Sequence, residues 1–224
     1  MLRYAFAMRP VLHGYKFSVY ARVVRLALRE KGVVYDWAEV DPFSQPPDAG
    51  LRQINPFGRV PVLLHAGLAL HETAAICRYV DAAFAGPPLQ PAGAAAIGQM
   101  AQVIAIVDSY GYWPMVRQVY AHRVFRPASG APVDEAQIGA GLVAAAPVLA
   151  ALNAIAAAGR VLAGPVITLA DLHLAPMVAA FEAAPEGAAL LHGHAHLVGW
   201  WQSIRRRDSM VATQIGLPGT PVLP

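Results

Sequence analysis

The chain has almost no cysteine, because only one of its 224 residues, Cys77, carries a thiol. A single thiol excludes a disulfide framework and any zinc site built from cysteines. Cys77 falls on the apolar face of a predicted helix, where we expect a buried small hydrophobe. The first ten residues also lack the continuous apolar segment of a secretory signal. Together these absences predict a cytoplasmic protein.

Charge is scarce as well. Charged residues make up 14% of the chain and hydrophobic residues 56%, a composition that excludes intrinsic disorder. The net charge of +3 comes from 17 lysines and arginines against 14 acids. The densest basic cluster is residues 205–207. A nucleic-acid-binding surface needs a broader basic stripe with interleaved aromatic residues. We therefore predict no nucleic-acid partner.

One long apolar run requires an explanation. Residues 139–159 contain almost no polar side chain and are long enough to cross a membrane. The run consists mainly of alanine, is interrupted by Pro147 and Asn153, and lacks aromatic residues at its ends. These features favour a buried helix of a helical domain, and we predict no membrane partner.

The sequence offers no pattern typical of a metal site. Three histidines alternate at His192, His194 and His196, but no acid or cysteine accompanies them closely. A metal centre needs a fixed ligand count and second-shell partners. We expect solvated loop histidines and no metal.

The first part of the chain alternates between strand and helix patterns. Strands are predicted at residues 11–15 and 33–40, and a hairpin at residues 60–64 and 66–70. Helices are predicted at residues 19–31 and 72–84, and residues 41–55 read as an irregular proline-rich loop. The order β-α-β followed by β-β-α is that of a thioredoxin-like domain, which we assign to residues 1–86.

The rest of the chain is predicted to be helical. Residues 87–93 form a linker rich in proline and glycine, and residues 94–224 form an all-helical C-terminal domain. Its helices are expected at residues 94–125, 134–158, 168–181 and 195–206, and residues 214–224 are expected to be irregular. The fold class is therefore an α/β domain followed by an all-α domain.

The segment Asn55-Pro56-Phe57-Gly58-Arg59-Val60-Pro61 is the first of two motifs that suggest chemistry. Pro61 begins or interrupts a strand, where proline removes a donor from the ladder. A cis Pro61 would turn the backbone of Val60 toward an extended peptide ligand. An ordinary trans proline at a strand edge is the alternative, and the sequence leaves both open.

Glu72 and Thr73, at the start of the last helix of the α/β domain, form the second motif. Free backbone N–H groups at a helix N-terminus bind carboxylates. The Glu72 carboxylate can accept an ammonium group, so the pair suits the two ends of an α-amino acid. Simple N-capping is the alternative.

The order of these motifs carries a family resemblance. Ser18 precedes a helix that contains Val24-Arg25-Leu26-Ala27-Leu28, then come the Asn55–Pro61 segment and Glu72-Thr73-Ala74-Ala75-Ile76. A capping box at Thr168-Leu169-Ala170-Asp171 follows in the helical part. This set resembles the glutathione transferase family, most closely the serine-type phi class and its bacterial relatives. The resemblance implies a homodimer that uses glutathione as co-substrate in detoxification.

The resemblance also assigns roles to residues. Ser18 would donate a hydrogen bond to the glutathione sulfur and stabilise the thiolate. N-capping of the following helix is the alternative role, and Tyr15 and Tyr20 are rival donors. A serine cannot form the mixed disulfide that a cysteine forms at this position in thiol-transferase relatives. The remaining glutathione-binding residues would be Arg59, Val60, Pro61, Glu72 and Thr73.

The chain departs from the family pattern at one place. Phi-like members have a His-Lys pair before the Asn-Pro-Phe-Gly segment, and it reaches the glycyl carboxylate. This chain has Pro46-Pro47-Asp48 there, so the contact is missing or is supplied by Arg52 or Arg59.

The second substrate is expected between the domains. Its pocket would be lined by Tyr20, Tyr110, Trp113 and Arg117, with Gly111 and Pro114 kinking the helix that carries the last three. The predicted function is conjugation of the glutathione thiolate to a hydrophobic electrophile. The alternatives are a glutathione-dependent peroxidase, dehalogenase or isomerase, or a non-catalytic scaffold of the same fold.

Overall fold

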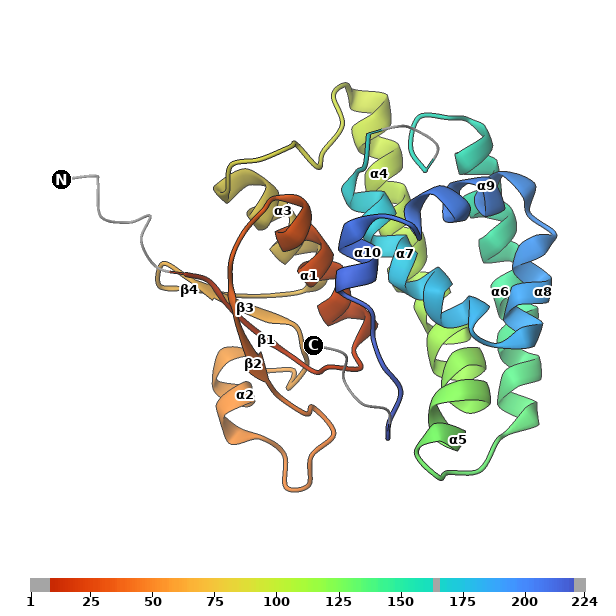
Figure 1. Cartoon of the computed structure of the whole chain (residues 1–224), viewed down its shortest axis with the longest axis horizontal. Coiled ribbons are helices and arrows are strands. Elements are labelled where there is room, and N and C mark those ends of the chain that lie inside the picture. The colour runs from red at the N-terminus through yellow and green to blue at the C-terminus, as the bar shows by residue number, and fades with distance from the viewer. Residues whose placement is uncertain (1–8, 163–165, 220–224) are drawn as a thin grey trace. The chain divides into compact units, whose positions relative to one another are not determined.

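The computed structural model describes residues 9–162 and 166–219 and divides the chain into two compact units (Figure 1). The first unit, here the sheet unit, extends to Pro88, and the second, the helical unit, begins at Leu89. A thioredoxin-like sheet unit followed by a helical unit is the fold class that the sequence predicts.

The sheet unit contains four strands and three helices among the described residues. In chain order they are β1 (Val11–Gly14), α1 (Val19–Glu30), β2 (Asp36–Glu39), α2 (Ala49–Ile54), β3 (Val62–His65), β4 (Leu68–His71) and α3 (Thr73–Ala83). The strand order in the sheet is β2-β1-β3-β4. β1 pairs parallel with β2 and antiparallel with β3, and β3 pairs antiparallel with β4. A right-handed crossover through α1 is the expected connection of the parallel pair.

Helices α1 and α3 lie side by side in the sheet unit (Figure 1). The buried face of α1 includes Val23, Val24 and Leu28, which recur at helical spacing. A buried ion pair also joins the two helices, since Lys31 Nζ lies 3.1 Å from Asp81 Oδ1. The same ammonium group donates to the carbonyl of Pro87 at 3.1 Å. Apolar packing and this pair thus fix α1, the helix that Ser18 caps.

The sequence-based prediction of an irregular loop at residues 41–55 is wrong in its second half. Helix α2 occupies Ala49–Ile54, with Asp48 as its N-cap, and the Asp48 carboxylate accepts a hydrogen bond from the Leu51 N–H at 2.8 Å. A helix of six residues is too short to show an apolar period. The aspartate after two prolines was the available signal.

The helical unit is built around one almost completely buried helix. Its elements are α4 (Ala94–Ile106), η1 (Val107–Gly111), η2 (Trp113–Phe125), α5 (Arg126–Ala128), α6 (Glu135–Ala157), α7 (Leu169–Glu182), α8 (Pro185–His192), α9 (Ala195–Ile204) and α10 (Asp208–Ala212). Twelve of the residues of α7 are buried, and α4, η2, α8 and α9 contact it. Helices α5, α8 and α10 are additions to the predicted set, and all three are short.

The single helix predicted at residues 94–125 changes its winding along its length. The chain is α-helical to Ile106 and π-helical over η1 and η2. The π-helical turns coincide with Gly111 and Pro114, two residues that weaken an α-helical ladder. Close packing accompanies the wider turns: a Cβ atom at Gly141 of α6 would lie 2.9 Å from the Pro114 carbonyl oxygen.

Helix α6 contains most of the long apolar run that the sequence analysis singled out. Its length and composition would allow it to cross a membrane. In the structure it packs against η2 and α9, and its buried residues include Leu149 and Leu152. The side chains of Trp200 and Trp201 on α9 are also buried. The run therefore supplies core contacts within the helical unit.

A capping box begins α7, as predicted. Asp171 Oδ2 accepts hydrogen bonds from the Thr168 N–H at 2.7 Å and the Thr168 hydroxyl at 2.6 Å. Its Oδ1 accepts from the Trp200 indole N–H at 2.8 Å. Burial raises the pKa of Asp171 above its ordinary value, and the hydrogen bonds from Thr168 and Trp200 oppose that rise. Each carboxylate oxygen has a partner, so this acid ties α7 to α9.

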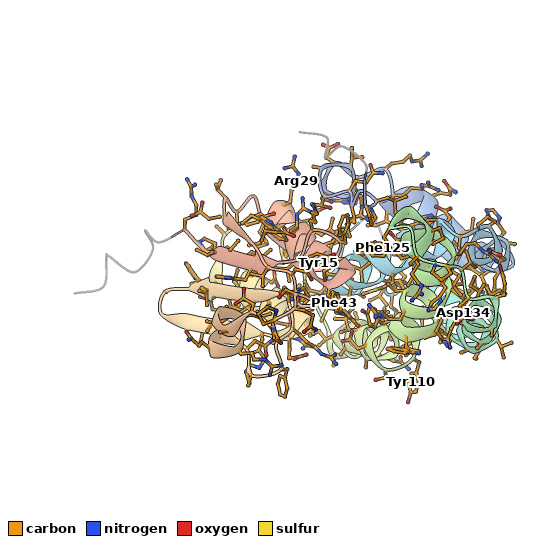
Figure 2. The ribbon with its side chains drawn as sticks, turned by 90° about the horizontal axis from the view of Figure 1, so that it is seen from below. Tyr15, Arg29, Phe43, Tyr110, Phe125 and Asp134 are labelled. Atoms are coloured by element: carbon orange, nitrogen blue, oxygen red, sulfur yellow. The ribbon has the colours of Figure 1, made fainter. Side chains whose placement is uncertain are left out.

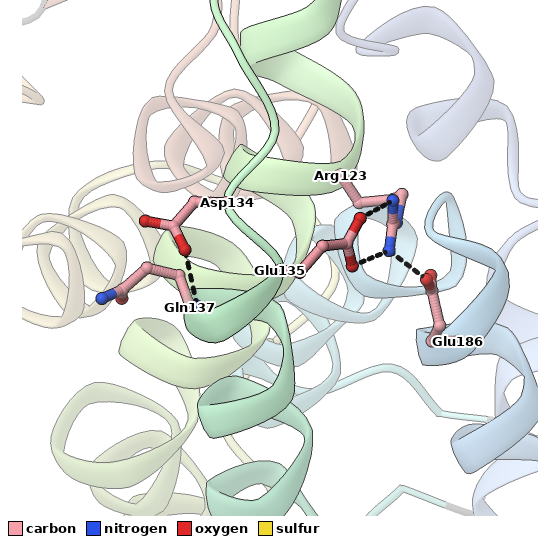
Figure 3. Close-up of polar contacts among 5 residues, drawn as sticks. All are labelled: Arg123, Asp134, Glu135, Gln137 and Glu186. Atoms are coloured by element: carbon pink, nitrogen blue, oxygen red, sulfur yellow. Dashed lines mark hydrogen bonds and ion pairs between the residues drawn. The ribbon is translucent and has the colours of Figure 1, made fainter.

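An exposed ion-pair network joins three helices of the same unit (Figure 3). The Arg123 guanidinium on η2 donates to both Glu135 oxygens, at 2.9 Å and 2.7 Å. It also pairs with Glu186 on α8. Beside it, the Asp134 carboxylate caps α6 by accepting from the Gln137 N–H at 3.1 Å. A bidentate arginine–carboxylate contact fixes the relative orientation of the two side chains even where solvent screens their electrostatic attraction.

Candidate functional site

The strand register brings the predicted glutathione-binding residues of the sheet unit to one end of the sheet. His13 of β1 pairs with Val62 of β3, and Val62 pairs with His71 of β4. β1 and β4 run in the same direction and β3 in the opposite one. Ser18 follows β1 and Glu72–Thr73 follow β4, whereas Val60–Pro61 precede β3. All three segments therefore lie at the same end of the sheet. Three segments far apart in the sequence meet there.

Ser18 occupies the N-cap of α1 and is half-buried. Its Oγ accepts a hydrogen bond from the Ala21 N–H at 3.1 Å, and its own N–H donates to the Tyr15 carbonyl at 2.8 Å. A hydroxyl has one proton and two acceptor lone pairs. Capping uses a lone pair and leaves the proton available, so the capping role and the sulfur-binding role are compatible. The positive end of α1 lies at the same point.

Tyr15 is less suited than Ser18 to stabilise a thiolate. Its ring packs edge-on against Phe17 and Phe43, with centroids 5.3 Å and 6.0 Å away. Burial first, then the carboxylates of Asp41 and Glu39, raise the pKa of Tyr15 above its ordinary value of 10.0. A phenol in negative potential is a weaker acid and a poorer partner for a second anion. Tyr20 lies in the first turn of α1 and is half-buried.

The loop before β3 presents the backbone of Val60. The Val60–Pro61 peptide bond is cis, the conformation that the sequence left open. Across residues 9–162 and 166–219, no protein backbone group pairs with the Val60 N–H or C=O. Buried Asn55 shapes this loop: its side-chain amide donates to the Arg59 carbonyl at 2.8 Å and its carbonyl accepts from Phe57 N–H at 3.1 Å. Sequence reasoning missed Asn55 as a site residue, although it opens the motif.

Glu72 and Thr73 form the N-terminus of α3. Glu72 has a φ of 70°, in the left-handed region that disfavours a residue with a Cβ. Such backbone conformations concentrate at ligand sites. Its side chain makes no capping hydrogen bond and is exposed, whereas Thr73 is buried. The capping alternative is therefore wrong for the Glu72 side chain, because no such bond forms.

The arginines proposed for the glycyl end differ in their surroundings. Arg59 and Arg52 are both exposed. The Arg52 side chain lies along Gly58, since a Cβ there would be 3.7 Å from the guanidinium carbon. Asp48, which precedes both arginines in the chain, caps α2. Both arginines stay candidates.

The other predicted pocket residues belong to the helical unit. Tyr110 of η1 and Trp113 of η2 have exposed fractions of 67% and 61%, so neither is a core residue. Tyr110 projects outward from its helix (Figure 2). Arg117 on η2 is also exposed. Cys77, by contrast, is buried on α3 as expected.

A metal centre finds no support in the part of the chain that the structure describes. No group of three or more histidine, cysteine, aspartate or glutamate side chains is positioned there to hold a metal ion. His192, His194 and His196 lie at the end of α8 and the start of α9.

Comparison with known proteins identifies the family. A family model described as the glutathione S-transferase N-terminal domain matches residues 12–88. Glutathione S-transferase 3 of Zea mays is 31% identical over 222 residues, which cover 96% of this chain and 97% of the maize protein. The chain belongs to the glutathione S-transferase family. The match includes the helical unit as well as the sheet unit.

Solved structures of glutathione S-transferases have the same fold. The apo structure of glutathione S-transferase III superposes with a TM-score of 0.81 at 29% identity and covers 96% of this chain and 100% of its own. Maize glutathione S-transferase I, in complex with an atrazine glutathione conjugate, gives a TM-score of 0.77 at 25% identity, with 92% and 96% covered. The candidate active site of this glutathione S-transferase is thus the end of the sheet where Ser18, Val60–Pro61 and Glu72–Thr73 lie.

Proposed function

We propose that the chain conjugates the glutathione thiolate to an electrophilic small molecule, with Ser18 as the donor that stabilises the sulfur. One observation carries the proposal: the Ser18 hydroxyl caps α1 through a lone pair and keeps its proton. Membership of the glutathione S-transferase family and the glutathione conjugate in the related maize enzyme support the reaction class.

The chemistry needs only a prepared nucleophile and a fixed geometry. The thiol loses its proton to solvent, and the hydrogen bond from Ser18 together with the positive end of α1 stabilises the thiolate. The sulfur then attacks an electrophilic carbon and forms a C–S bond. In a displacement, the bond to the leaving group breaks and the leaving group departs with the electron pair. Holding the two reactants together supplies much of the acceleration.

The peptide is held, in this proposal, at three places. The backbone of Val60 pairs with the cysteinyl part, as a short strand addition before Pro61. The N-terminus of α3 binds the γ-glutamyl carboxylate at Thr73, and the exposed Glu72 carboxylate receives the amine. Arg59 or Arg52 binds the glycyl carboxylate.

Three substitutions at Ser18 separate capping from catalysis. Ser18→Ala removes the cap and the donor, Ser18→Gly removes the donor but costs only a few tenths of a kcal/mol in capping, and Ser18→Thr keeps both. We expect Ala and Gly to lower kcat/KM about a hundredfold and to raise the pKa of the bound thiol, measured by thiolate absorbance. If instead the Gly variant turned over at nearly the wild-type rate and only the Ala variant lost activity, the loss would reflect helix stability. Ser18 would then have no part in the mechanism.

The peroxidase, dehalogenase and isomerase alternatives use the same thiolate and differ in the second substrate. Steady-state assays with a peroxide, an alkyl halide and an activated aryl halide distinguish them. A scaffold without catalysis predicts no turnover with any of them. Isothermal titration with glutathione tests conjugation and the three alternative activities together, because each of them requires that the protein bind glutathione.

We also propose a cytoplasmic homodimer with a role in detoxification. The homodimer is supported by large apolar side chains that stay exposed, such as Phe57 at 66% and Val143 at 77%. The second-substrate pocket is proposed to include Tyr20, Tyr110, Trp113 and Arg117. Light scattering after size-exclusion chromatography measures the assembly, and a monomer at micromolar concentration would contradict it.

A further inference from the structure

Two histidines share one face of the sheet. His13 of β1 pairs with Val62 of β3, and Val62 pairs in turn with His71 of β4. Residues that lie directly opposite each other on neighbouring strands point to the same face, so the two imidazoles flank Val62 there. Both rings are half-buried, whereas the Val62 side chain is completely buried. Another part of the chain therefore covers this row.

Helices α1 and α3 cover the opposite face. Leu12 points away from the histidine row, because successive residues of a strand alternate. Its partner is Trp37, and the Arg25 guanidinium carbon of α1 lies 5.5 Å from the centroid of a Trp37 ring. On the same face, His65 Nδ1 lies 2.7 Å from the Tyr79 hydroxyl of α3. Helix α2 lies on the other side of the strands, the side of the histidine row (Figure 1).

His13 interacts with the start of α2. Burial, the larger cause, lowers the pKa of His13 below 6.5, and the carboxylate of Asp48 partly opposes this effect. Asp48 is the N-cap of α2 and accepts the Leu51 N–H at 2.8 Å, so its carboxylate is fixed relative to the helix. A proton on His13 therefore favours an arrangement in which the ring reaches water over one in which it is covered.

His71 contacts the chain just after α2. The centroid of its ring lies 5.8 Å from that of Phe57, in an edge-to-face arrangement. The Nδ1 atom of His71 is buried and has no hydrogen-bond partner among the residues that the structure describes. Packing, and not a hydrogen bond at Nδ1, therefore holds the ring against Phe57.

Residues 48–59 form one connected segment between these two contacts, which we call the glycyl segment. The side-chain amide of Asn55 donates to the Arg59 carbonyl at 2.8 Å and so fixes the loop after α2. The Arg52 side chain of α2 lies along Gly58 of that loop, where a Cβ would be 3.7 Å from the guanidinium carbon. Both arginines proposed for the glycyl carboxylate thus belong to the segment that the two histidines contact.

Several charged groups lie on the same side of the sheet as the two histidines. Asp36 of β2 pairs in register with Val11, two positions before His13, and therefore shares their face. Its carboxylate lies 3.1 Å from Arg9 Nη1 and has a cation of its own. The others belong to the glycyl segment or follow His71 directly; they are Asp48, Arg52, Arg59 and Glu72. Asp48 is the acid whose charge acts on His13.

We propose that His13 and His71 are positioning residues for the glycyl end of glutathione. The two rings hold the glycyl segment against the sheet, and protonation of His13 weakens this contact. Preference for glutathione over a peptide that lacks glycine should therefore decline in mild acid. The inference rests on the proposed function, since it needs Arg52 or Arg59 at the glycyl carboxylate. It goes beyond that function by assigning a role to two residues that do not touch the peptide.

The test compares glutathione with γ-glutamylcysteine, which is the same peptide without its glycine. The measured quantity is the ratio of the Kd for γ-glutamylcysteine to the Kd for glutathione, obtained by calorimetric titration under reducing conditions. Both peptides have the γ-glutamyl amine and carboxylate and the thiol, so the titration of these groups cancels in the ratio. We expect the wild-type ratio to fall about threefold between about pH 7.5 and about pH 5.5.

Variants at the start of α2 test the role of the proton. In His13→Gln the ratio should not depend on pH, because glutamine does not titrate. Asp48→Asn keeps an oxygen for the helix cap and should deepen the decline, because no carboxylate then opposes the effect of burial on His13. His65→Gln is the matched control: it removes a half-buried histidine that contacts α3, and should leave the ratio and its pH dependence unchanged.

A pair of variants at His71 tests the packing contact. His71→Ala removes the ring and should lower the ratio about threefold at neutral pH, because the glycyl segment then has to be ordered when the peptide binds. His71→Phe keeps a ring against Phe57 and should preserve the ratio. A loss in His71→Phe as large as in His71→Ala would overturn the packing role.

The remaining outcomes separate this inference from the proposed function. A ratio that falls with pH in His13→Gln as it does in the wild type would overturn the role of His13. A wild-type ratio near one at every pH would overturn the whole inference, because the glycyl end would then contribute nothing to binding. Failure of both peptides to bind contradicts the proposed function instead.

Discussion

The sheet unit and the helical unit use polar side chains in opposite ways. At the edge of the sheet, Ser18 and Glu72 are accessible, and each keeps a donor or acceptor after its contacts within the protein are counted. In the helical unit, the carboxylate of Asp171 is buried and both of its oxygens are bonded. A polar atom that is accessible and can still form a hydrogen bond therefore indicates the candidate site. A buried polar group whose hydrogen bonds are all formed within the protein stabilises the fold.

The buried pair of Lys31 and Asp81 is the exception that tests this contrast, because it is a saturated core contact inside the sheet unit. Lys31→Met should destabilise the unit by about 3–5 kcal/mol, since it leaves a buried carboxylate without its cation. The double variant Lys31→Met, Asp81→Leu should recover most of this loss. Urea unfolding measures both. A double variant no more stable than the single one would show that the pair is required for the fold.

Asp171 is the matching case in the helical unit. Asp171→Ala should cost about 3 kcal/mol, because it removes the capping box and leaves the buried indole N–H of Trp200 unpaired. The control is Asp134→Ala, an exposed N-cap of α6, with an expected loss of about 1 kcal/mol. The shift of the urea midpoint gives each value. Equal losses would mean that burial adds nothing to the cap.

Glu72 should give opposite effects on stability and binding. Glu72→Gly relieves a φ of 70° and should stabilise the fold by about 1 kcal/mol, while glutathione affinity falls about tenfold with the lost carboxylate. Ala66 in the β3–β4 turn has a φ of 50° and serves as the control. Ala66→Gly should stabilise similarly and leave glutathione binding unchanged in calorimetric titration. Weakened binding in both variants would point to the backbone of the unit, not to the Glu72 side chain.

The smallest expected effect is a pH dependence from His13 on β1. Burial lowers the pKa of His13 below its ordinary value of 6.5, and the nearby Asp48 carboxylate partly opposes this. The folded state thus binds the proton less well than the unfolded chain. The contribution of His13 is therefore complete above pH 6.5 and is lost as the pH falls through the lower folded pKa. His13→Gln should flatten the fall in the free energy of unfolding, measured with urea, by less than about 1 kcal/mol, because His13 is only half-buried and solvent screens its charge. An unchanged slope would assign the fall to other groups.

Much of the site could be predicted from sequence because its parts are local. The N-cap at Ser18, the helix start at Glu72–Thr73 and the capping box of Thr168 and Asp171 each depend on residues a few positions apart. Helix α2 escaped prediction because six residues show no apolar period. The π-helical winding of η1 and η2 escaped because Gly111 and Pro114 indicate a weakened α-helical ladder but not the winding that replaces it. Glu39 gave no signal because its partner Lys16 lies in a distant loop. Asn55 was overlooked although it opens the motif and its partners, Phe57 and Arg59, are local.

The sequence by itself determined the order of the strands and of the longer helices, the family, and the residue types at the candidate site, since local patterning and spacing encode them. Tertiary structure decided the rest. The register of β1, β3 and β4 brings distant segments together, and the parallel pairing of β1 with β2 brings Phe43, Glu39 and Asp41 beside Tyr15. Long-range pairing sets these neighbours, and no sequence period reports a contact between segments that meet only in the fold.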